Sequence, residues 1–160
     1  RWIALLDIEP IRSAIVRNLK ATTGIQTIIA EQSNEQPPYP FIAIKFTTLG
    51  KQVGRVTQYM QEGVQYTEQD IEMILSVSSF SEEMDESINN AYAALQFFEV
   101  DGIQTLQEAN IAVVKTTEIS NRDTFISIEY ERRTGFDVRI RTRAQSIKEL
   151  DSIDTIYMNN

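Results

Sequence analysis

The sequence predicts a single α+β domain whose mainly antiparallel sheet is covered by helices on one face. Two amphipathic helix patterns, at 8–23 and 82–99, are separated and followed by short stretches of alternating polarity. Strands that follow one another, instead of each leading into a helix, are typical of an α+β domain. The principal predicted strands are 41–48, 71–80, 111–119 and 136–143. The 160 residues suit one core and show no internal repeat, so we expect one domain over 1–160.

The first helix is predicted over 8–23. Pro10 suits its first turn, where the missing N–H has no helical partner. Ile11, Ile15 and Leu19 recur every four residues and form an apolar stripe, and Gly24 is a natural C-terminal stop. A short apolar run at 25–30 then predicts the first strand.

The second helix is predicted over 82–99, with Ser81 as its N-cap. Its apolar face is expected to consist of residues at three- and four-residue steps: Met84, Ile88, Ala91, Leu95 and Phe98. If this face is the core face, Leu95→Ala costs about 2–5 kcal/mol.

Residues 50–70 allow two interpretations. The segment is rich in Gln, Thr, Tyr and Gly, and it forms either a long mobile loop or a protruding two-stranded arm that turns near Gly63. Long segments of this kind in compact domains are often functional. Tyr59, Met60 and Tyr66 give an arm side chains to bury on a neighbouring subunit.

The C-terminal third predicts further strands. Residues 121–123 predict a turn, and 124–132 and 136–143 predict paired strands around Gly135. Beyond them, 147–156 carries apolar residues at steps of three, for which a short helix and a terminal strand are both open.

The composition excludes most catalytic chemistry. The chain has no cysteine and no histidine, which removes disulfides, thiolate nucleophiles, most transition-metal sites and the commonest general base near neutral pH. No GxSxG, P-loop, GxGxxG or EF-hand pattern occurs. We therefore expect a protein that is not an enzyme and has no cofactor or metal. No apolar run is long enough to cross a membrane.

Charge is distributed unevenly along the chain. The net charge of −8 argues against nucleic-acid binding, which needs clustered Lys and Arg. Between Arg55 and Lys115 there is no basic residue, and this middle span carries eleven acids. The stretch from Arg122 to Arg143 is instead rich in arginine. The sequence thus has an acidic middle and a basic later segment.

Three arginines, Arg139, Arg141 and Arg143, share one face of a predicted strand. One interpretation is a subunit boundary at which Arg139 and Arg141, with Arg132 or Arg133, meet carboxylates of the middle span of the next subunit. The other is a solvated strand face with local partners such as Glu129 and Glu131.

An acidic cluster opens the second predicted helix, formed by Glu82, Glu83, Asp85 and Glu86. The helix dipole favours acids there, which explains the cluster structurally. The functional alternative is the lining of a channel, because a negative wall repels passing DNA.

Three stretches resemble the phage neck terminator proteins, small subunits at the head-proximal end of phage tails. They are PYPFI at 38–42, SVSSFS at 76–81, and NRD at 121–123 followed by EYERRTGFDVR at 129–139. Thr134 stands where this family is expected to have an aromatic residue. The resemblance favours the arm over the loop for residues 50–70, and it implies a tail-terminator-like fold.

The resemblance implies a structural subunit with no active site. Its function is to form a ring, expected to be hexameric, that caps the tail tube and joins it to the head connector. The implied partners are further copies of the chain, the tail tube protein, the sheath where one exists and the neck proteins, in the virion. DNA passes through without specific binding. The alternative is a monomeric adaptor that grips a partner through its sheet edges.

Overall fold

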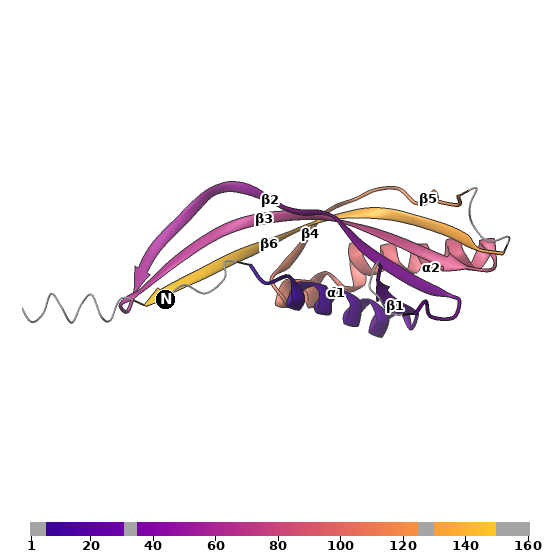
Figure 1. The fold of residues 1–160 in the computed structure, drawn as a ribbon, viewed down its shortest axis with the longest axis horizontal. Helices are drawn as coiled ribbons and strands as arrows, with labels where there is room; N and C mark the ends of the chain where they lie inside the picture. Colours follow the sequence, from indigo (N-terminus) through magenta and orange to yellow (C-terminus); the bar gives the residue numbers. More distant parts are fainter. Residues whose placement is uncertain (1–5, 31–34, 125–129, 150–160) are drawn as a thin grey trace, which may run out of the picture.

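The computed structural model describes residues 6–30, 35–124 and 130–149. They form a single α+β domain in which the helices cover one face of a long, twisted sheet (Figure 1). The elements are α1 (Ile8–Thr23), β1 (Gln26–Ile29), β2 (Phe41–Gln61), β3 (Val64–Ser81), α2 (Met84–Gln96), the π-helical turn η1 (Phe97–Asp101), α3 (Ile103–Glu108), β4 (Ile111–Thr116), β5 (Ser120–Asn121) and β6 (Arg132–Glu149). This confirms the predicted fold class.

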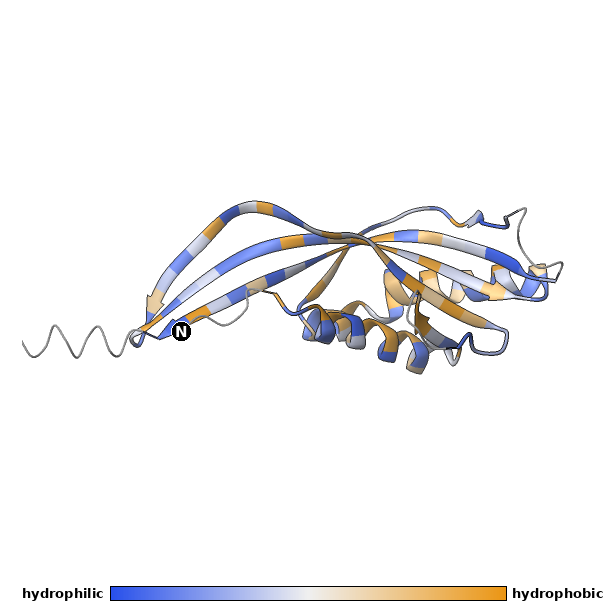
Figure 2. Ribbon diagram, in the orientation of Figure 1, coloured by the Kyte–Doolittle hydropathy of each residue, from blue (hydrophilic) through white to orange (hydrophobic). Residues whose placement is uncertain are grey.

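The strands lie in the order β1-β2-β3-β6-β4, and β5 pairs with one end of β6. Only β1 and β2 run parallel; every other described pair is antiparallel. The core lies between the helices and the part of the sheet that they cover. Apolar and polar residues alternate along β3 and β6 in this part of the sheet (Figure 2). The opposite face of the sheet is called the open face below.

α1 has the predicted bounds. Asp7 is its N-cap and accepts a hydrogen bond from the Glu9 N–H at 3.1 Å. Gly24 ends the helix in the left-handed conformation, with φ at 74°. Ile15 and Leu19 are fully buried, as the four-residue stripe predicts. No helix of the described residues is both long and apolar enough to span a bilayer.

The predicted core face of the second helix is wrong in part: Ala91 and Phe98 are buried as predicted, but Met84, Ile88 and Leu95 are not. The residues of α2 that are buried against the sheet are Ser87, Ala91 and Ala94, whereas Ile88 and Leu95 are half-buried. Small residues face the sheet because the helix lies close to it: the Ser87 hydroxyl donates to the Ser79 carbonyl oxygen at 3.0 Å. The bulky side chains follow one turn later, where η1 buries Phe97 and Phe98 completely.

The N-cap prediction for α2 also needs correction. Glu83 occupies the N-cap position, and its side chain does not cap the helix. The Ser81 hydroxyl lies two residues earlier, where it accepts from the Glu83 N–H at 3.0 Å and donates to Glu86 at 2.6 Å. Ser81 therefore ties the strand end to the first turn without being the cap.

The strand pair predicted around Gly135 is wrong as well. Gly135 lies inside β6, which runs unbroken from Arg132 to Glu149 and forms one long strand beside β3. A Cβ at Gly135 would lie 2.4 Å from the Val77 carbonyl oxygen, so glycine serves close strand approach here and not a turn. Residues 125–129 of the predicted strand 124–132 lie outside the described part.

For residues 147–156 the sequence left a short helix and a terminal strand open, and the structure shows a strand as far as Glu149, where β6 ends. The remainder of 147–156 lies outside the described residues. The strand predicted at 111–119 ends at Thr116. The predicted turn at 121–123 overlaps the two-residue strand β5, and the side chain of Asn121 accepts from the Asp123 N–H at 2.7 Å.

Residues 50–70 form an arm, not a loop. β2 and β3 continue well past the helices and turn at Glu62 and Gly63, both of which have positive φ. β6 follows β3 to the tip, where Val64 pairs with Glu149. The arm, defined as residues 50–70 together with the adjoining 143–149 of β6, is therefore three-stranded, and it projects far beyond the helical layer (Figure 1).

Candidate functional site

The tip of the arm carries the aromatic side chains singled out in the sequence. Tyr59 and Tyr66 are directly opposite each other on β2 and β3, and their rings stack at 5.0 Å between centroids. Met60 is 56% exposed and Val56 is 51% exposed, so the arm presents apolar surface that no described part of the chain covers. The structure thus brings all three residues to the tip, with Tyr59 and Tyr66 together on one face and Met60, the next residue of β2, on the opposite face.

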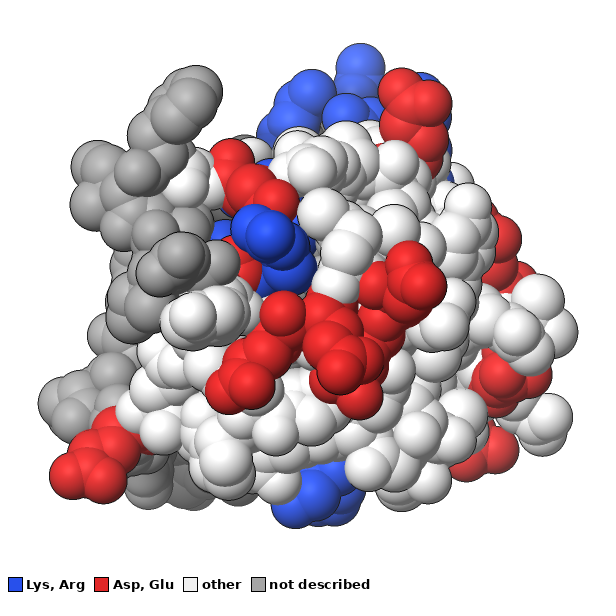
Figure 3. Space-filling view, turned by 90° about the vertical axis from the view of Figure 1, so that its right-hand side faces the viewer, with Lys and Arg blue, Asp and Glu red and all other residues white. Residues whose placement is uncertain are grey.

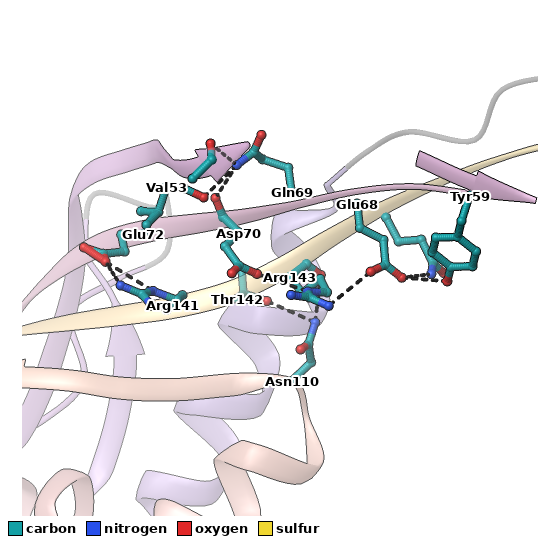
Figure 4. A network of polar contacts seen from close by, with 12 residues as sticks. Val53, Tyr59, Glu68, Gln69, Asp70, Glu72, Asn110, Arg141, Thr142 and Arg143 are labelled. Carbon is teal, nitrogen blue, oxygen red and sulfur yellow. Dashed lines mark hydrogen bonds and ion pairs between the residues drawn. The ribbon is translucent and has the colours of Figure 1, made fainter. Parts of the chain in front are cut away.

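An ion-pair ladder runs along the open face at the base of the arm (Figure 4). It consists of Glu68, Asp70 and Glu72 from β3 and Arg139, Arg141 and Arg143 from β6. Arg141 donates to Glu72 at 2.6 Å, and Arg143 donates to both Asp70 and Glu68 at 3.1 Å.

The sequence correctly placed the three arginines on one face, and their partners do come from the acidic middle span. Those partners, however, belong to the same chain, because β3 and β6 are neighbours. Arg139 is the least engaged of the three, with its nearest carboxylate oxygen, on Glu72, at 3.9 Å. Whether these arginines lie near a subunit boundary stays a prediction.

The ladder shifts the acidity of its members. Hydrogen bonds from the Tyr59 hydroxyl and the Gln145 amide, followed by the charge of Arg143, lower the pKa of Glu68 below its ordinary value. The hydrogen bond from Arg141 lowers the pKa of Glu72. The same contact with Glu68 raises the pKa of Tyr59. All three shifts favour a folded arm at neutral pH.

Acidification is expected to loosen the arm before the body. Because the folded pKa values of Glu68 and Glu72 are depressed, their contribution to stability is present above about pH 4.5, the ordinary value, and is lost as pH falls through the folded values. The measurement is hydrogen exchange at pH 7 and at pH 3.5, with each rate expressed relative to the intrinsic rate at that pH. On acidification, residues 64–72 should lose more protection than residues 73–81. The variant Glu68→Gln/Glu72→Gln should lack this differential response, and equal loosening of both segments would contradict the prediction.

A buried glutamine supports the bend of the arm. Gln69 is 2% exposed, and its side-chain amide donates to the carbonyl oxygens of Val53 at 2.9 Å and Gly54 at 3.3 Å. The β2–β3 register shifts between Val53 and Thr57, so the Gln69 side chain binds the main chain of β2 where this bulge begins. The sequence alone did not reveal this role.

The NRD stretch at 121–123 is a structural clamp. The Arg122 guanidinium donates to the hydroxyls of Ser76 and Ser78 at 2.6 and 3.1 Å, and to Asp137 at 3.0 Å. Asp123 accepts from the Arg133 N–H at 2.7 Å. The stretch is therefore held against the open face, on the part of the sheet whose other face is covered by helices. The polar side chains of Arg122 and Asp123 find hydrogen-bond partners within the chain.

Arg132 and Arg133 lie at the end of the sheet that is remote from the arm. Arg132 is within 4.0 Å of Asp123. Arg133 donates to the buried Glu131 and lies over the Phe80 ring at 5.0 Å. Glu131 also accepts from the Tyr39 hydroxyl at 2.6 Å. These two arginines are thus separated from Arg139 and Arg141 along β6, and the four do not form one cluster.

The acidic cluster lies at this same end, where α2 begins. Glu82, Glu83 and Asp85 are exposed, and Glu86 is half-buried through its contact with Ser81. Figure 3 looks onto this end of the molecule and shows acidic side chains gathered near its centre. Among the described residues, no group of acidic side chains has an arrangement that could hold a metal ion.

Comparison with known proteins identifies the family. A family model described as phage neck terminator protein matches residues 9–160. The chain belongs to the phage neck terminator protein family. It is accordingly a structural protein of the phage neck and a component of the virion, and not an enzyme. The three stretches that carried the resemblance all lie within the matched range.

Among solved structures, the chain is similar to one in the structure titled "Virion of native gene transfer agent (GTA) particle". That likeness has 12% identity and a TM-score of 0.35, and it covers 84% of this chain and 94% of the other. A search of curated proteins finds no match.

Proposed function

We propose that this neck protein forms a homo-oligomeric ring, expected to be a hexamer, which caps the tail tube and joins it to the head connector. The observation that supports a ring best is the arm. It projects past the helical layer with apolar side chains exposed at its tip, and both of its outer strands have free edges among the described residues. Exposed edges and apolar tips are liabilities in a monomer and contact surfaces in an assembly.

The proposed contacts follow from where the side chains lie. Tyr59, Met60 and Tyr66 lie on the next subunit, and the arm is mobile until it docks there. Arg139 and Arg141, with Arg132 or Arg133, lie at or near a boundary and fix its orientation. Glu82, Glu83, Asp85 and Glu86 face the channel, where their charge keeps passing DNA from binding. The partners are the tail tube protein, the sheath where one exists and the connector proteins, assembled in the host cytoplasm.

The test is the mass of the purified chain by light scattering, alone and then with tail tube protein. A ring is expected in at least the second sample. Hydrogen exchange should show residues 50–70 protected in the assembly and exposed in the free subunit. A chain that stays monomeric and binds tube protein one-to-one would favour the adaptor, and equal strong protection in both states would contradict docking of the arm.

The variant Tyr59→Ser/Met60→Ser is expected to prevent assembly while leaving the unfolding midpoint of the body unchanged. Tyr130→Ser is the matched control, because Tyr130 is 67% exposed and lies outside the arm. Assembly of the double variant at the same concentration as the control would exclude the arm tip from the contact.

A further inference from the structure

One position of the sheet brings two like charges together. Lys115 of β4 and Arg139 of β6 are directly opposite each other in the antiparallel pair, next to a shift in its register. Like charges at directly opposed positions destabilise a sheet. Among the paired residues of the described strands, this is the one pair of like charges. The other pairs that carry two charges are of opposite sign: Lys51 with Glu72, Asp70 with Arg143, and Glu72 with Arg141.

The two cations share a small pocket on the open face. Its volume is about 150 Å³, and Ile74, Thr117 and Asp137 line it together with Lys115 and Arg139. All five residues lie in the described part of the chain. Figure 3 shows Lys and Arg side chains gathered at the top, which is the side of the open face. The pocket thus opens on a surface where cations gather, although the chain as a whole is acidic.

Two carboxylates lie beside the pocket cations, and each is engaged by another arginine. Glu72 accepts from Arg141 at 2.6 Å and lies 3.9 Å from Arg139. Asp137, which lines the pocket, accepts from Arg122 at 3.0 Å. With the two pocket cations, the group therefore holds four cations and two carboxylates, an excess of two positive charges.

Neither pocket cation has a close partner. Lys115 is exposed and forms no ion pair with a described residue. The side chain of Arg139 is 49% exposed, and its nearest carboxylate oxygen is the one at 3.9 Å. Glu118 is exposed three residues beyond Lys115, and it is not within ion-pair distance of either cation. The free subunit therefore leaves the two positive charges of the pocket without a carboxylate of their own.

We propose that this pocket binds one carboxylate, an aspartate or glutamate side chain that a partner protein of the neck presents. The Arg139 guanidinium and the Lys115 ammonium are charged donors for the two oxygens of that carboxylate, and Ile74 offers an apolar wall to its methylene groups. A bound anion neutralises the like-charge pair. Binding therefore recovers the free energy that the pair costs in the free subunit.

Two observations favour a carboxylate over the phosphates of DNA. A pocket of about 150 Å³ takes a single side chain, whereas nucleic-acid binding needs a series of cations along the phosphate backbone. Glu72 and Asp137 flank the pocket cations, and their negative charge repels a continuous polyanion. This inference rests on the proposed boundary near Arg139: it adds Lys115 to that boundary and states which chemical group is bound there.

The variant Lys115→Glu separates the cost of the pair from its function. It places opposite charges at the two opposed positions, so the melting temperature of the free subunit should rise by about 1–4 °C. Arg17→Glu is the matched control, because Arg17 is exposed on α1 and the change in charge is the same. If the melting temperature of Lys115→Glu falls, or rises no more than that of the control, the like-charge pair costs nothing and the proposal is overturned.

Binding is measured by NMR titration of the free subunit with a hexaglutamate peptide. The resonances of Thr117, Asp137 and the Arg139 Nε–H should shift saturably in the wild type and in Arg17→Glu, and the Kd should be at least tenfold weaker in Lys115→Glu. No saturable shift at these residues, or the same Kd in Lys115→Glu as in the control, overturns the site. A short oligothymidylate that binds there more tightly than hexaglutamate overturns the carboxylate in favour of DNA.

These outcomes are independent of the mass measurement that tests the ring. A chain that stays monomeric but binds hexaglutamate at the pocket contradicts the ring and supports the site. A chain that forms a ring but shows no such binding contradicts the site alone.

Discussion

The variant Phe98→Ala is expected to lower the free energy of unfolding by about 3–5 kcal/mol. Phe98 is fully buried and packs edge-on against Phe97, at 5.1 Å between ring centroids, and against Phe136 of β6, at 6.2 Å. Its removal leaves a cavity at the point where η1 meets the sheet, and close-packed neighbours refill such a cavity only in part. Urea unfolding followed by circular dichroism measures the loss.

Leu95→Ala is the matched comparison, because the sequence places Leu95 on the same face as Phe98. In the structure Leu95 is only half-buried at the margin of the core. We expect it to cost less than about 2 kcal/mol, below the range for a fully buried leucine. Equal losses for the two variants would show that α2 packs in the orientation predicted from the sequence.

The second large effect is expected from Gly135→Ala. The added Cβ would lie 2.4 Å from the Val77 carbonyl oxygen and 3.0 Å from the Cδ and Cζ atoms of Arg122. The backbone oxygen belongs to β3 and cannot turn away, so β6 must shift and the Arg122 clamp must open. Overpacking of this kind costs about 1–3 kcal/mol.

Gly50→Ala is the control for this variant. The Cβ added at Gly50 would lie 3.4 Å from the Ile71 Cγ2 atom, an ordinary contact distance, and Gly50 is exposed on the arm. Thermal unfolding should separate the two variants, and hydrogen exchange at 117–124 should rise only in Gly135→Ala. An unchanged melting temperature for Gly135→Ala would contradict the close approach of β3 and β6.

Local sequence patterns predicted most of the fold. They were wrong where the conformation depends on contacts with residues far away in the sequence. α1 has its predicted bounds because its stripe, cap and stop all lie within the segment. The face of α2 was wrong in part because the helix lies so close to the sheet that the small residues Ser87 and Ala94 face it, and because η1 changes the periodicity at Phe97. Gly135 was assigned to a turn because a glycine required by close strand approach has the same local signature.

The candidate site shows the same division. Alternation placed Arg139, Arg141 and Arg143 on one face, but it could not name their partners, since the pairing of β3 with β6 joins residues about seventy positions apart. The buried role of Gln69 left no signal in the sequence, because it depends on a bulge in the neighbouring strand. The arm itself was foreseen as one of two alternatives, without its third strand.

The bulges of β2 have a geometric consequence. The 21 residues of β2 lie beside a shorter stretch of β3, residues 64–80. When a strand with extra residues pairs with a shorter stretch of its neighbour, the extra residues make it bend away from that neighbour. Figure 1 shows β2 arching away from β3 in this way. The curvature of β2 therefore depends on residues that have no partner on β3 and are exposed, such as Leu49 and Arg55. Adding or removing a residue there would re-aim the tip while every β3–β6 pair and the whole core stay as they are.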